Sequence, residues 1–239
     1  MLIDPATLTA DFPRLEEIEK ASTRFVTQAM LNFREEAAQI YQNERDKPQD
    51  IGEDITREAL DRLGVSKIDQ RLFGKMDYKR ARYVFHPDYA IRQALFVDSK
   101  AEDVLTGRGT ATLQTAQTSL RIMHFRRGAA VDEQGTLPAI LNLAGHQYLT
   151  TTIFVKYNYQ PLSAEQFRLE DITVACVPNA MLQANYNPNA NTTIWRAGRN
   201  APTRGEPFRV RLVFALLQAR TRWRIQNIPM PPANFTWQE

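Results

Sequence analysis

A change of hydrophobic period along the chain limits the folds that it can adopt. Over residues 13–45, apolar side chains recur at spacings of three and four, which predicts a long amphipathic helix. Asp11 can cap the start of this helix, and Pro13 suits an early helical position. A second helix is predicted over residues 54–63 and ends at Gly64. A long amphipathic helix of this kind packs on a core or contacts a second copy of the chain.

Beyond residue 80 the pattern becomes that of β-strands. Apolar or alternating runs cover residues 82–86, 93–98, 151–159, 172–177 and 208–214. The remaining stretches are predicted as a helix flanked by loops over 101–135, a long ordered loop over 185–207 and an extended tail over 229–239. Helices first, then strands with helices between them, predict one α/β domain with a central mixed sheet.

The composition is that of a globular protein with a buried core. Of the 239 residues 43% are hydrophobic and 24% are charged. No apolar run approaches the roughly 20 residues of a membrane span, and residues 1–5 do not resemble a secretory signal. The one cysteine, Cys176, excludes an intrachain disulfide and fits a reducing compartment. We therefore expect a cytoplasmic protein without membrane contact.

The net charge of +3 hides a strong asymmetry. Residues 1–63 carry fourteen Asp and Glu against eight Lys and Arg, whereas residues 196–224 carry eight Arg, no Lys and one Glu. The planar guanidinium suits phosphate and guanine edges. These arginines therefore indicate a nucleic-acid-binding protein whose binding residues lie late in the sequence. A solvated basic surface is the alternative explanation of the same charges.

Two carboxylates and a lysine form the candidate catalytic group. The apolar run 93–97 predicts a buried strand that delivers Asp98 to its end. Asp98 and Lys100 then share one face of the strand while Ser99 points back. Asp77 precedes another strand-like stretch. Asp-x-Lys is a short pattern, and its alternative explanation is a pair of solvated charges at a strand end.

This set has a definite chemistry, the hydrolysis of a phosphodiester. Mg²⁺ prefers one or two carboxylates together with waters and phosphate oxygens. The predicted metal set is Asp77, Asp98 and Ser99, and Lys100 can orient the attacking water and stabilise charge on phosphorus. Glu53, at the opening of the second predicted helix, is a further acid near the metal or a helix N-terminal charge.

Other catalytic constellations fail. His86, His124 and His146 show no ligand spacing, and zinc lacks cysteine partners. The sequence contains no nucleophile elbow, phosphate-binding loop or dinucleotide fingerprint. No nucleotide cofactor is therefore expected.

Base reading is predicted for the segment 197–211. Phe208, Val210, Leu212 and Phe214 form the apolar face of a strand, so Arg209 and Arg211 share the opposite face. Both can address guanines in one major groove, and each bidentate contact is worth about 1–3 kcal/mol of discrimination. The alternative is a pair of surface arginines that contact phosphates only.

Several blocks in one order resemble the SfiI-like Type II restriction endonucleases of the PD-(D/E)xK nuclease superfamily and, more distantly, BglI. They run from Glu53-Asp54-Ile55-Thr56 through Asp77-Tyr78-Lys79-Arg80, 93–100, 152–157 and Tyr186-Asn187-Pro188 to Arg204-Gly205-Glu206 and Arg209-x-Arg211. Met76 stands where the superfamily has a proline, and Arg199 replaces a lysine of the family's base-reading loop.

The resemblance implies a restriction-endonuclease-like core in a single domain. Its parts are a helical region of about 1–64, a catalytic core of about 65–180, and a DNA-reading loop and strand of about 185–224. It implies that Asp77, Asp98 and Lys100 are the metal-binding and catalytic set, with Mg²⁺ as the metal. It also implies that Arg199, Asn200, Arg204, Arg209 and Arg211 contact double-stranded DNA.

The implied activity is cleavage of an interrupted GC-rich palindrome that leaves 3′ overhangs, by a homodimer or homotetramer. A repair or junction nuclease of the same superfamily and a non-catalytic DNA-binding protein are the alternatives.

Overall fold

The structure is a computed structural model that describes residues 2–64, 81–86, 89–107, 109–198 and 209–239, with residues 81–86 as backbone only. In chain order its elements are η1 (Pro5–Ala10), α1 (Phe12–Asn43), α2 (Pro48–Asp61), β1 (Ala81–His86), β2 (Ile91–Asp103), α3 (Val104–Gly107), β3 (Thr110–Leu113), η3 (Thr115–Gln117), β4 (Ile122–Arg126), β5 (Ala129–Glu133), β6 (Ile140–Leu143), β7 (His146–Pro161), β8 (Phe167–Val177), η4 (Ala180–Leu182), α4 (Gln183–Tyr186), β9 (Trp195–Ala197), β10 (Val210–Val213), α5 (Phe214–Arg220), η5 (Arg222–Arg224) and β11 (Ile225–Pro229).

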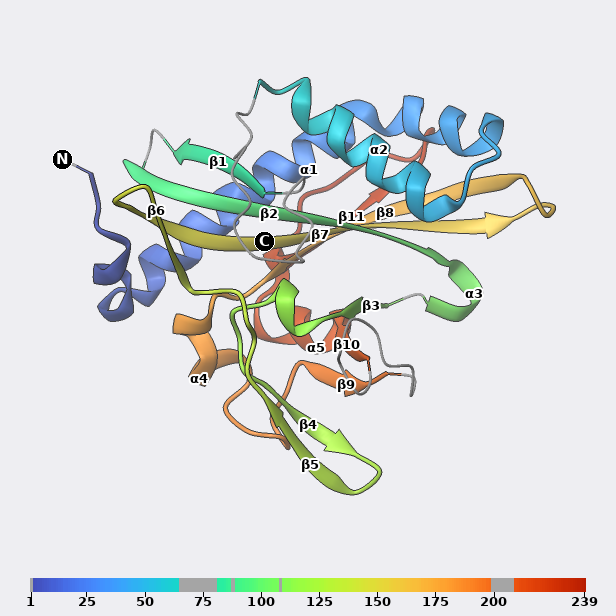
Figure 1. The fold of residues 1–239 in the computed structure, drawn as a ribbon. Helices are drawn as coiled ribbons and strands as arrows, with labels where there is room; N and C mark the ends of the chain where they lie inside the picture. The colour runs from blue at the N-terminus through green and yellow to red at the C-terminus, as the bar shows by residue number, and fades with distance from the viewer. Residues whose placement is uncertain (1, 65–80, 87–88, 108, 199–208) are drawn as a thin grey trace.

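A mixed sheet forms the centre of the fold (Figure 1). Within the described residues its order is β1-β2-β7-β8-β11, and β6 also pairs with β7. β2 and β7 run parallel, with Asp98 opposite Phe154 and Lys100 opposite Lys156. The other neighbouring strands of this sheet are antiparallel. The predicted α/β class with a central mixed sheet is confirmed.

The two faces of this sheet have different covers (Figure 1). α1 and α2 cover one face, where Val97, Val155 and Tyr157 lie in one hydrophobic cluster with residues of both helices. On the other face, Phe154 lies in a second cluster with Leu212 of β10 and residues of α5. β10 belongs to a small sheet of order β3-β10-β9, and β4 and β5 form a separate two-stranded sheet. Alternate residues of β2 and β7 therefore face either the helices or the small sheet.

The long N-terminal helix agrees with its prediction, while the second helix begins earlier than predicted. The Asp11 carboxylate accepts the backbone N–H of Arg14 at 3.1 Å and so caps α1. α2 starts at Pro48, and Gly52 lies inside it rather than before it. A Cβ on Gly52 would lie 2.8 Å from the ring of Tyr157, so a glycine is needed for the helix to pack closely on the sheet.

The strand predictions place the sheet correctly but miss several ends. β2 continues to Asp103 because its polar second half still pairs with β7. β10 ends at Val213, and Phe214 begins α5 instead of ending the strand. The helix predicted within 101–135 is wrong, since α3 has four residues and most of the regular structure there is in β3, β4 and β5. Their strand pairing is with distant residues or across a tight turn, which local pattern does not reveal.

The C-terminal segment also differs from the predicted extended tail. β11 adds a strand beside β8, and Phe235 and Trp237 pack against the α1–α2 cluster. Glu239 makes ion pairs with Lys20 at 2.7 Å and with Arg24 at 2.8 Å, both from α1. Among the described helices, none is both long and apolar enough to cross a membrane.

Candidate active site and DNA-reading surface

The side chains of Asp98 and Lys100 meet on one face of β2. Lys100 Nζ lies 2.5 Å from Asp98 Oδ2, and Asp98 is 5% exposed. Lys100 Nζ also lies 5.5 Å from the ring centre of Phe154, which is the residue opposite Asp98 on β7. The apolar run before Asp98 forms the buried part of the strand, so the carboxylate sits where water is largely excluded and its electrostatic interactions are strong.

Ser99 points to the opposite face, as the alternation predicts. Its Oγ donates to Thr56 Oγ1 of α2 at 2.8 Å, and Thr56 Oγ1 is 2.7 Å from the hydroxyl of Tyr157. This buried chain of hydroxyls connects β2 to the helix layer. The Ser99 side chain therefore points away from Asp98. Of Ser99, only the backbone carbonyl could be a ligand of a metal ion bound beside Asp98.

Glu53 does not open a helix. It lies half-buried in the second turn of α2, because the helix begins at Pro48. The helix-terminus explanation of its charge is therefore wrong, since the dipole effect falls off within the first turn. Its helix packs against the Ser99 face of β2, and its part in catalysis stays a prediction.

Four predicted site residues lie outside the described residues: Asp77, Arg199, Asn200 and Arg204. Within the described part of the chain, no group of three or more His, Cys, Asp or Glu side chains could hold a metal ion. The oxygens of Asp98 and the carbonyl of Ser99 are hard donors of the kind that Mg²⁺ prefers. The two described members of the predicted metal set thus fit this ion in chemistry, and Asp77 would have to complete the set.

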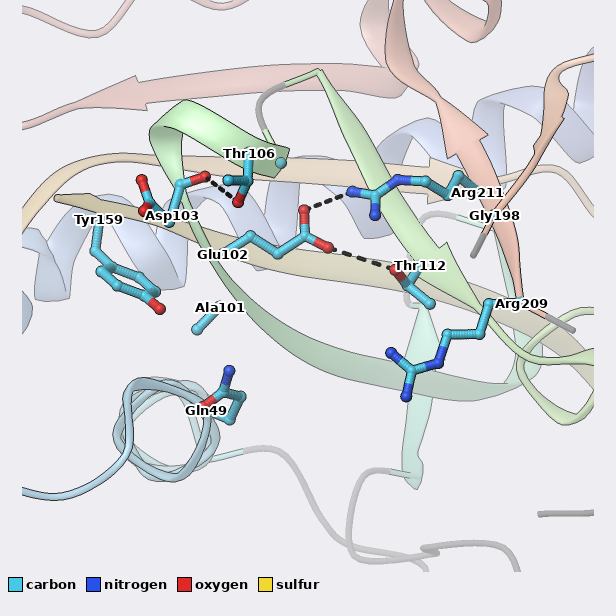
Figure 2. A pocket seen from close by; sticks show the side chains of 11 residues that line it. Gln49, Ala101, Glu102, Asp103, Thr106, Thr112, Tyr159, Gly198, Arg209 and Arg211 are labelled. Atoms are coloured by element: carbon cyan, nitrogen blue, oxygen red, sulfur yellow. Dashed lines mark hydrogen bonds and ion pairs between the residues drawn. The ribbon is translucent and has the colours of Figure 1, made fainter. Parts of the chain in front are cut away.

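Arg209, directly before β10, and Arg211, within it, line one cavity of about 240 Å³ (Figure 2). Val210 and Leu212 are buried, in agreement with the predicted apolar face of this strand. Arg209 is exposed. Arg211 is 19% exposed, because Arg211 Nη2 donates to Glu102 Oε2 at 2.7 Å and Arg211 Nε donates to Thr110 Oγ1 at 2.6 Å.

Two charged residues beside Arg211 were missed by sequence reasoning. Glu102 follows Lys100 by two positions on the same face of β2, and continuing the alternation one step further would have found it. Lys156 is fully buried on β7, 3.1 Å from Glu102, and donates to the carbonyls of Gly107 and Thr110. Burial lowers the pKa of Lys156, and the Glu102 carboxylate opposes this shift.

Arg196 is a further exposed arginine on this surface. It lies on β9 directly opposite Arg211 on β10, so the two side chains share one face of the small sheet. It belongs to the arginine-rich stretch 196–224, but its place beside Arg211 depends on strand pairing.

The same stretch is not one basic surface. Arg224 is fully buried and pairs with Glu19 of α1 at 2.7 Å. Burial lowers the pKa of Arg224, but the neighbouring Glu19 carboxylate and other partners outweigh this and the net shift is upward. Arg224 is not among the predicted DNA-binding residues, and its burial shows that the excess of arginine in 196–224 does not all lie on a surface.

A mixed sheet that brings an Asp and a Lys together on one face, beside a small sheet with exposed arginines, defines a nuclease with the restriction-endonuclease fold. Two solved structures share this architecture. Tetrameric SfiI bound to cognate DNA matches with a TM-score of 0.79 at 29% identity, over 95% of this chain and 88% of that one. BglI bound to its DNA recognition sequence matches with a TM-score of 0.76 at 17% identity, over 95% of this chain and 94% of that one, and supports the fold alone.

The sequence comparisons identify the family. The family model described as Type II restriction enzyme SfiI matches residues 25–228. The Type II restriction enzyme SfiI of Streptomyces fimbriatus is 32% identical over 229 residues, which cover 90% of this chain and 84% of that enzyme. The chain belongs to the SfiI family of Type II restriction enzymes and is a site-specific deoxyribonuclease.

Proposed function

We propose that the enzyme hydrolyses both strands of DNA at an interrupted, GC-rich palindrome and leaves 3′ overhangs. The observation that carries the proposal is the contact between Asp98 and Lys100 on β2 in a chain of this family. A relative solved with its substrate, SfiI bound to cognate DNA, supports DNA as the substrate.

Mg²⁺ is the proposed cofactor, held by Asp77, Asp98 and the carbonyl of Ser99. When bound, this ion supplies a nucleophilic water at neutral pH and neutralises charge on the phosphate. Lys100 orients the attacking water and stabilises the negative charge that develops on phosphorus. Asp98 fixes Lys100 through their 2.5 Å ion pair, and the Phe154 ring lies 5.5 Å from the ammonium.

Sequence choice is proposed for Arg199, Asn200, Arg204, Arg209 and Arg211. Arg209 and Arg211 are the described members, and they line a cavity together with Glu102. The other three precede β10 in the sequence and lie outside the described residues. Cleavage of both strands of a palindrome requires two active sites, so we propose a homodimer or a homotetramer. The tetrameric state of the SfiI relative favours the latter.

Replacing Lys100 tests the catalytic assignment. Lys100→Ala should keep specific DNA binding but lose at least about 100-fold in single-turnover cleavage, because the charge stabiliser is gone. The measurements are a gel-shift titration and cleavage of plasmid DNA with and without Mg²⁺. Lys47→Ala removes an exposed lysine next to α2 and should cut normally.

Undiminished cleavage by Lys100→Ala would contradict the assignment. Sequencing the ends produced by the wild-type enzyme gives the recognition site, the spacer and the overhang together. Diffuse products without a common end sequence would instead favour a nuclease that recognises DNA shape.

A further inference from the structure

Glu102 connects the catalytic strand to the strand that carries Arg211. It lies two residues beyond Lys100 on the same face of β2. Its Oε2 accepts Nη2 of Arg211 at 2.7 Å, and its Oε1 accepts the hydroxyl of Thr112 on β3 at 3.4 Å. Lys156 of β7 lies 3.1 Å from the same carboxylate. One side chain thus binds three other strands, and Figure 2 shows it extending between Arg211 and Thr112.

The contacts of Arg211 engage one edge of its guanidinium. Nε donates to Thr110 Oγ1 at 2.6 Å, and Nη2 donates to Glu102 Oε2 at 2.7 Å. A guanidinium has five N–H donors in a fixed plane. The Nε–Nη2 edge is therefore held by protein groups, and among the described residues the Nη1–Nη2 edge remains for O6 and N7 of a guanine.

The charges around Glu102 make its carboxylate necessary for this geometry. Arg211 and the buried Lys156 are two cations that approach the same carboxylate. The Arg211 and Glu102 side chains are both 19% exposed and that of Lys156 is 0% exposed, so water screens the cations poorly. Without the carboxylate the two cations repel, and Arg211 is the one whose charged end can move toward solvent.

We propose that Glu102 is a positioning residue for base recognition, which holds Arg211 in one orientation and fixes it relative to Asp98 and Lys100. The inference rests on the proposed function, because it takes Arg211 as a reader of guanine. Glu102 lies on β2, the strand that carries Asp98 and Lys100. Sequence choice therefore depends partly on this strand, and an incorrect base at Arg211 can affect it through Glu102.

The experiment is single-turnover cleavage by Glu102→Gln on a set of DNA substrates. One carries the cognate site found with the wild-type enzyme, and the others each change one G·C pair of it to A·T. Gln keeps the shape of Glu102 but removes its charge. The ratio of cognate to altered-site rates should fall by about 10-fold or more at one position of each half-site, because a bidentate arginine contact is worth this order of discrimination.

The matched control is Glu170→Gln, which breaks an Arg–Glu pair of the same 2.7 Å length, between Arg168 and Glu170 on β8. It should leave the ratio unchanged. Arg211→Ala should lower the ratio at the same base pair, and Glu102→Gln should add nothing to it in the double variant. Thr110→Val removes the acceptor for Nε, together with the long 3.5 Å bond from the same hydroxyl to the Gly107 carbonyl, and should lower the ratio less, so it serves if Glu102→Gln does not fold.

Two results would overturn the inference. The first is an unchanged ratio in folded Glu102→Gln, or in Thr110→Val where Glu102→Gln does not fold, which includes equal fold losses on the cognate and altered sites. The second is full additivity with Arg211→Ala. Equal losses would mean that Glu102 serves the chemical step or stability alone. Failure of the wild-type enzyme to cut DNA at a defined sequence would instead refute the proposed function, so the two failures are distinguishable.

Discussion

Arg224 and Arg211 come from the same arginine-rich stretch, and each has a nitrogen 2.7 Å from a glutamate oxygen. The surroundings of the two pairs differ completely. The side chains of Arg224 and Glu19 are both 0% exposed, whereas those of Arg211 and Glu102 are both 19% exposed. An ion pair of one length can therefore stabilise a core or orient a side chain toward a ligand.

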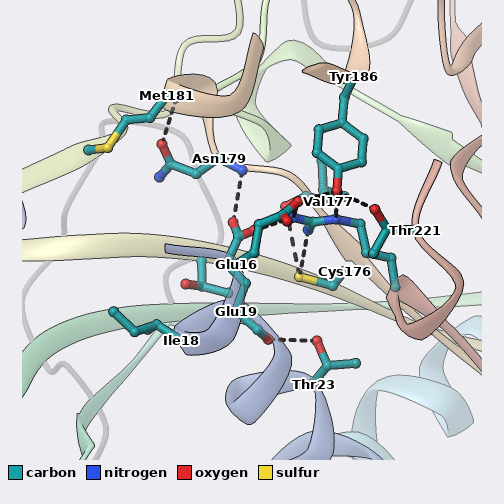
Figure 3. Close-up of polar contacts among 12 residues, drawn as sticks. Glu16, Ile18, Glu19, Thr23, Cys176, Val177, Asn179, Met181, Tyr186 and Thr221 are labelled. Atoms are coloured by element: carbon teal, nitrogen blue, oxygen red, sulfur yellow. Dashed lines mark hydrogen bonds and ion pairs between the residues drawn. The ribbon is translucent and has the colours of Figure 1, made fainter. Parts of the chain in front are cut away.

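Protein groups surround Arg224 on every side. Its Nε donates to the Tyr186 hydroxyl at 2.8 Å and its Nη1 to Cys176 Sγ at 3.6 Å. Its Nη2 donates to Glu19 Oε2 at 2.7 Å and to Glu16 Oε1 at 3.3 Å. The residues that carry these acceptors, Glu16, Glu19, Cys176 and Tyr186, are labelled in Figure 3. Every nitrogen of this guanidinium has a protein acceptor, so Arg224 joins α1 to the C-terminal region and has no role in reading DNA.

The difference shows that the number of arginines is a weak guide to function. What matters is whether an edge of the guanidinium is left for another molecule. Among the described residues, the partners of Arg211 engage only Nε and one N–H of Nη2, which leaves such an edge.

The largest expected effect is on stability, at Arg224. Arg224→Met leaves the Glu19 carboxylate buried without its cation and should lower the free energy of unfolding by about 3–5 kcal/mol. Urea denaturation measures this. The double variant Glu19→Gln with Arg224→Met should recover part of the loss, since no uncompensated charge remains. Arg220→Met, at an exposed arginine of α5, should change stability by less than about 0.5 kcal/mol.

Replacement of Arg211 by methionine should instead affect discrimination between DNA sites more than stability. Arg211→Met should lower discrimination against an altered G·C pair by about 1–3 kcal/mol, while its loss of stability should be smaller than that of Arg224→Met. Competitive binding to cognate and altered sites measures the first quantity and urea denaturation the second. A loss of stability at Arg211 equal to that at Arg224, with discrimination intact, would remove the distinction between the two pairs.

The smallest expected effect is a pH dependence of the Arg224 region. Burial raises the pKa of Cys176 from 9.0 to about 12, and that of Tyr186 from 10.0 to about 12. Their contribution to stability is therefore complete below pH 9 and is lost as the pH rises toward 12. For Cys176 the loss should be about 1 kcal/mol at pH 10.

A comparison of wild type with Cys176→Ser isolates the contribution of the Cys176 thiol to the pH dependence of stability. Urea denaturation between pH 8 and 10 should show a shallower decline in the variant, because serine does not titrate in this range. Parallel declines in the two proteins would mean that the thiol titrates alike in the folded and unfolded chains.

Part of the site could be predicted from the sequence. The alternation that places Asp98 and Lys100 on one face and Ser99 on the other is a local property of an extended chain, and the structure has this arrangement. Glu102 obeys the same alternation, yet its importance could not be predicted, because Arg211 is 109 residues away in the sequence. The second helix is predicted to begin after Gly52, but Gly52 lies inside α2. The adjacent ring of Tyr157 explains why a glycine stands there, and this contact cannot be read from the local sequence.

The sequence alone determined the α/β class, the long first helix and the shared face of Asp98 and Lys100, since these follow from local periodicity. The tertiary structure decided which arginines are enclosed and which keep an edge for DNA. Glu19 and Arg224 are 205 residues apart, and only the packing of α1 against the C-terminal region brings them together. Two arginines from the same arginine-rich stretch have different surroundings because burial and partners are set by contacts between distant segments.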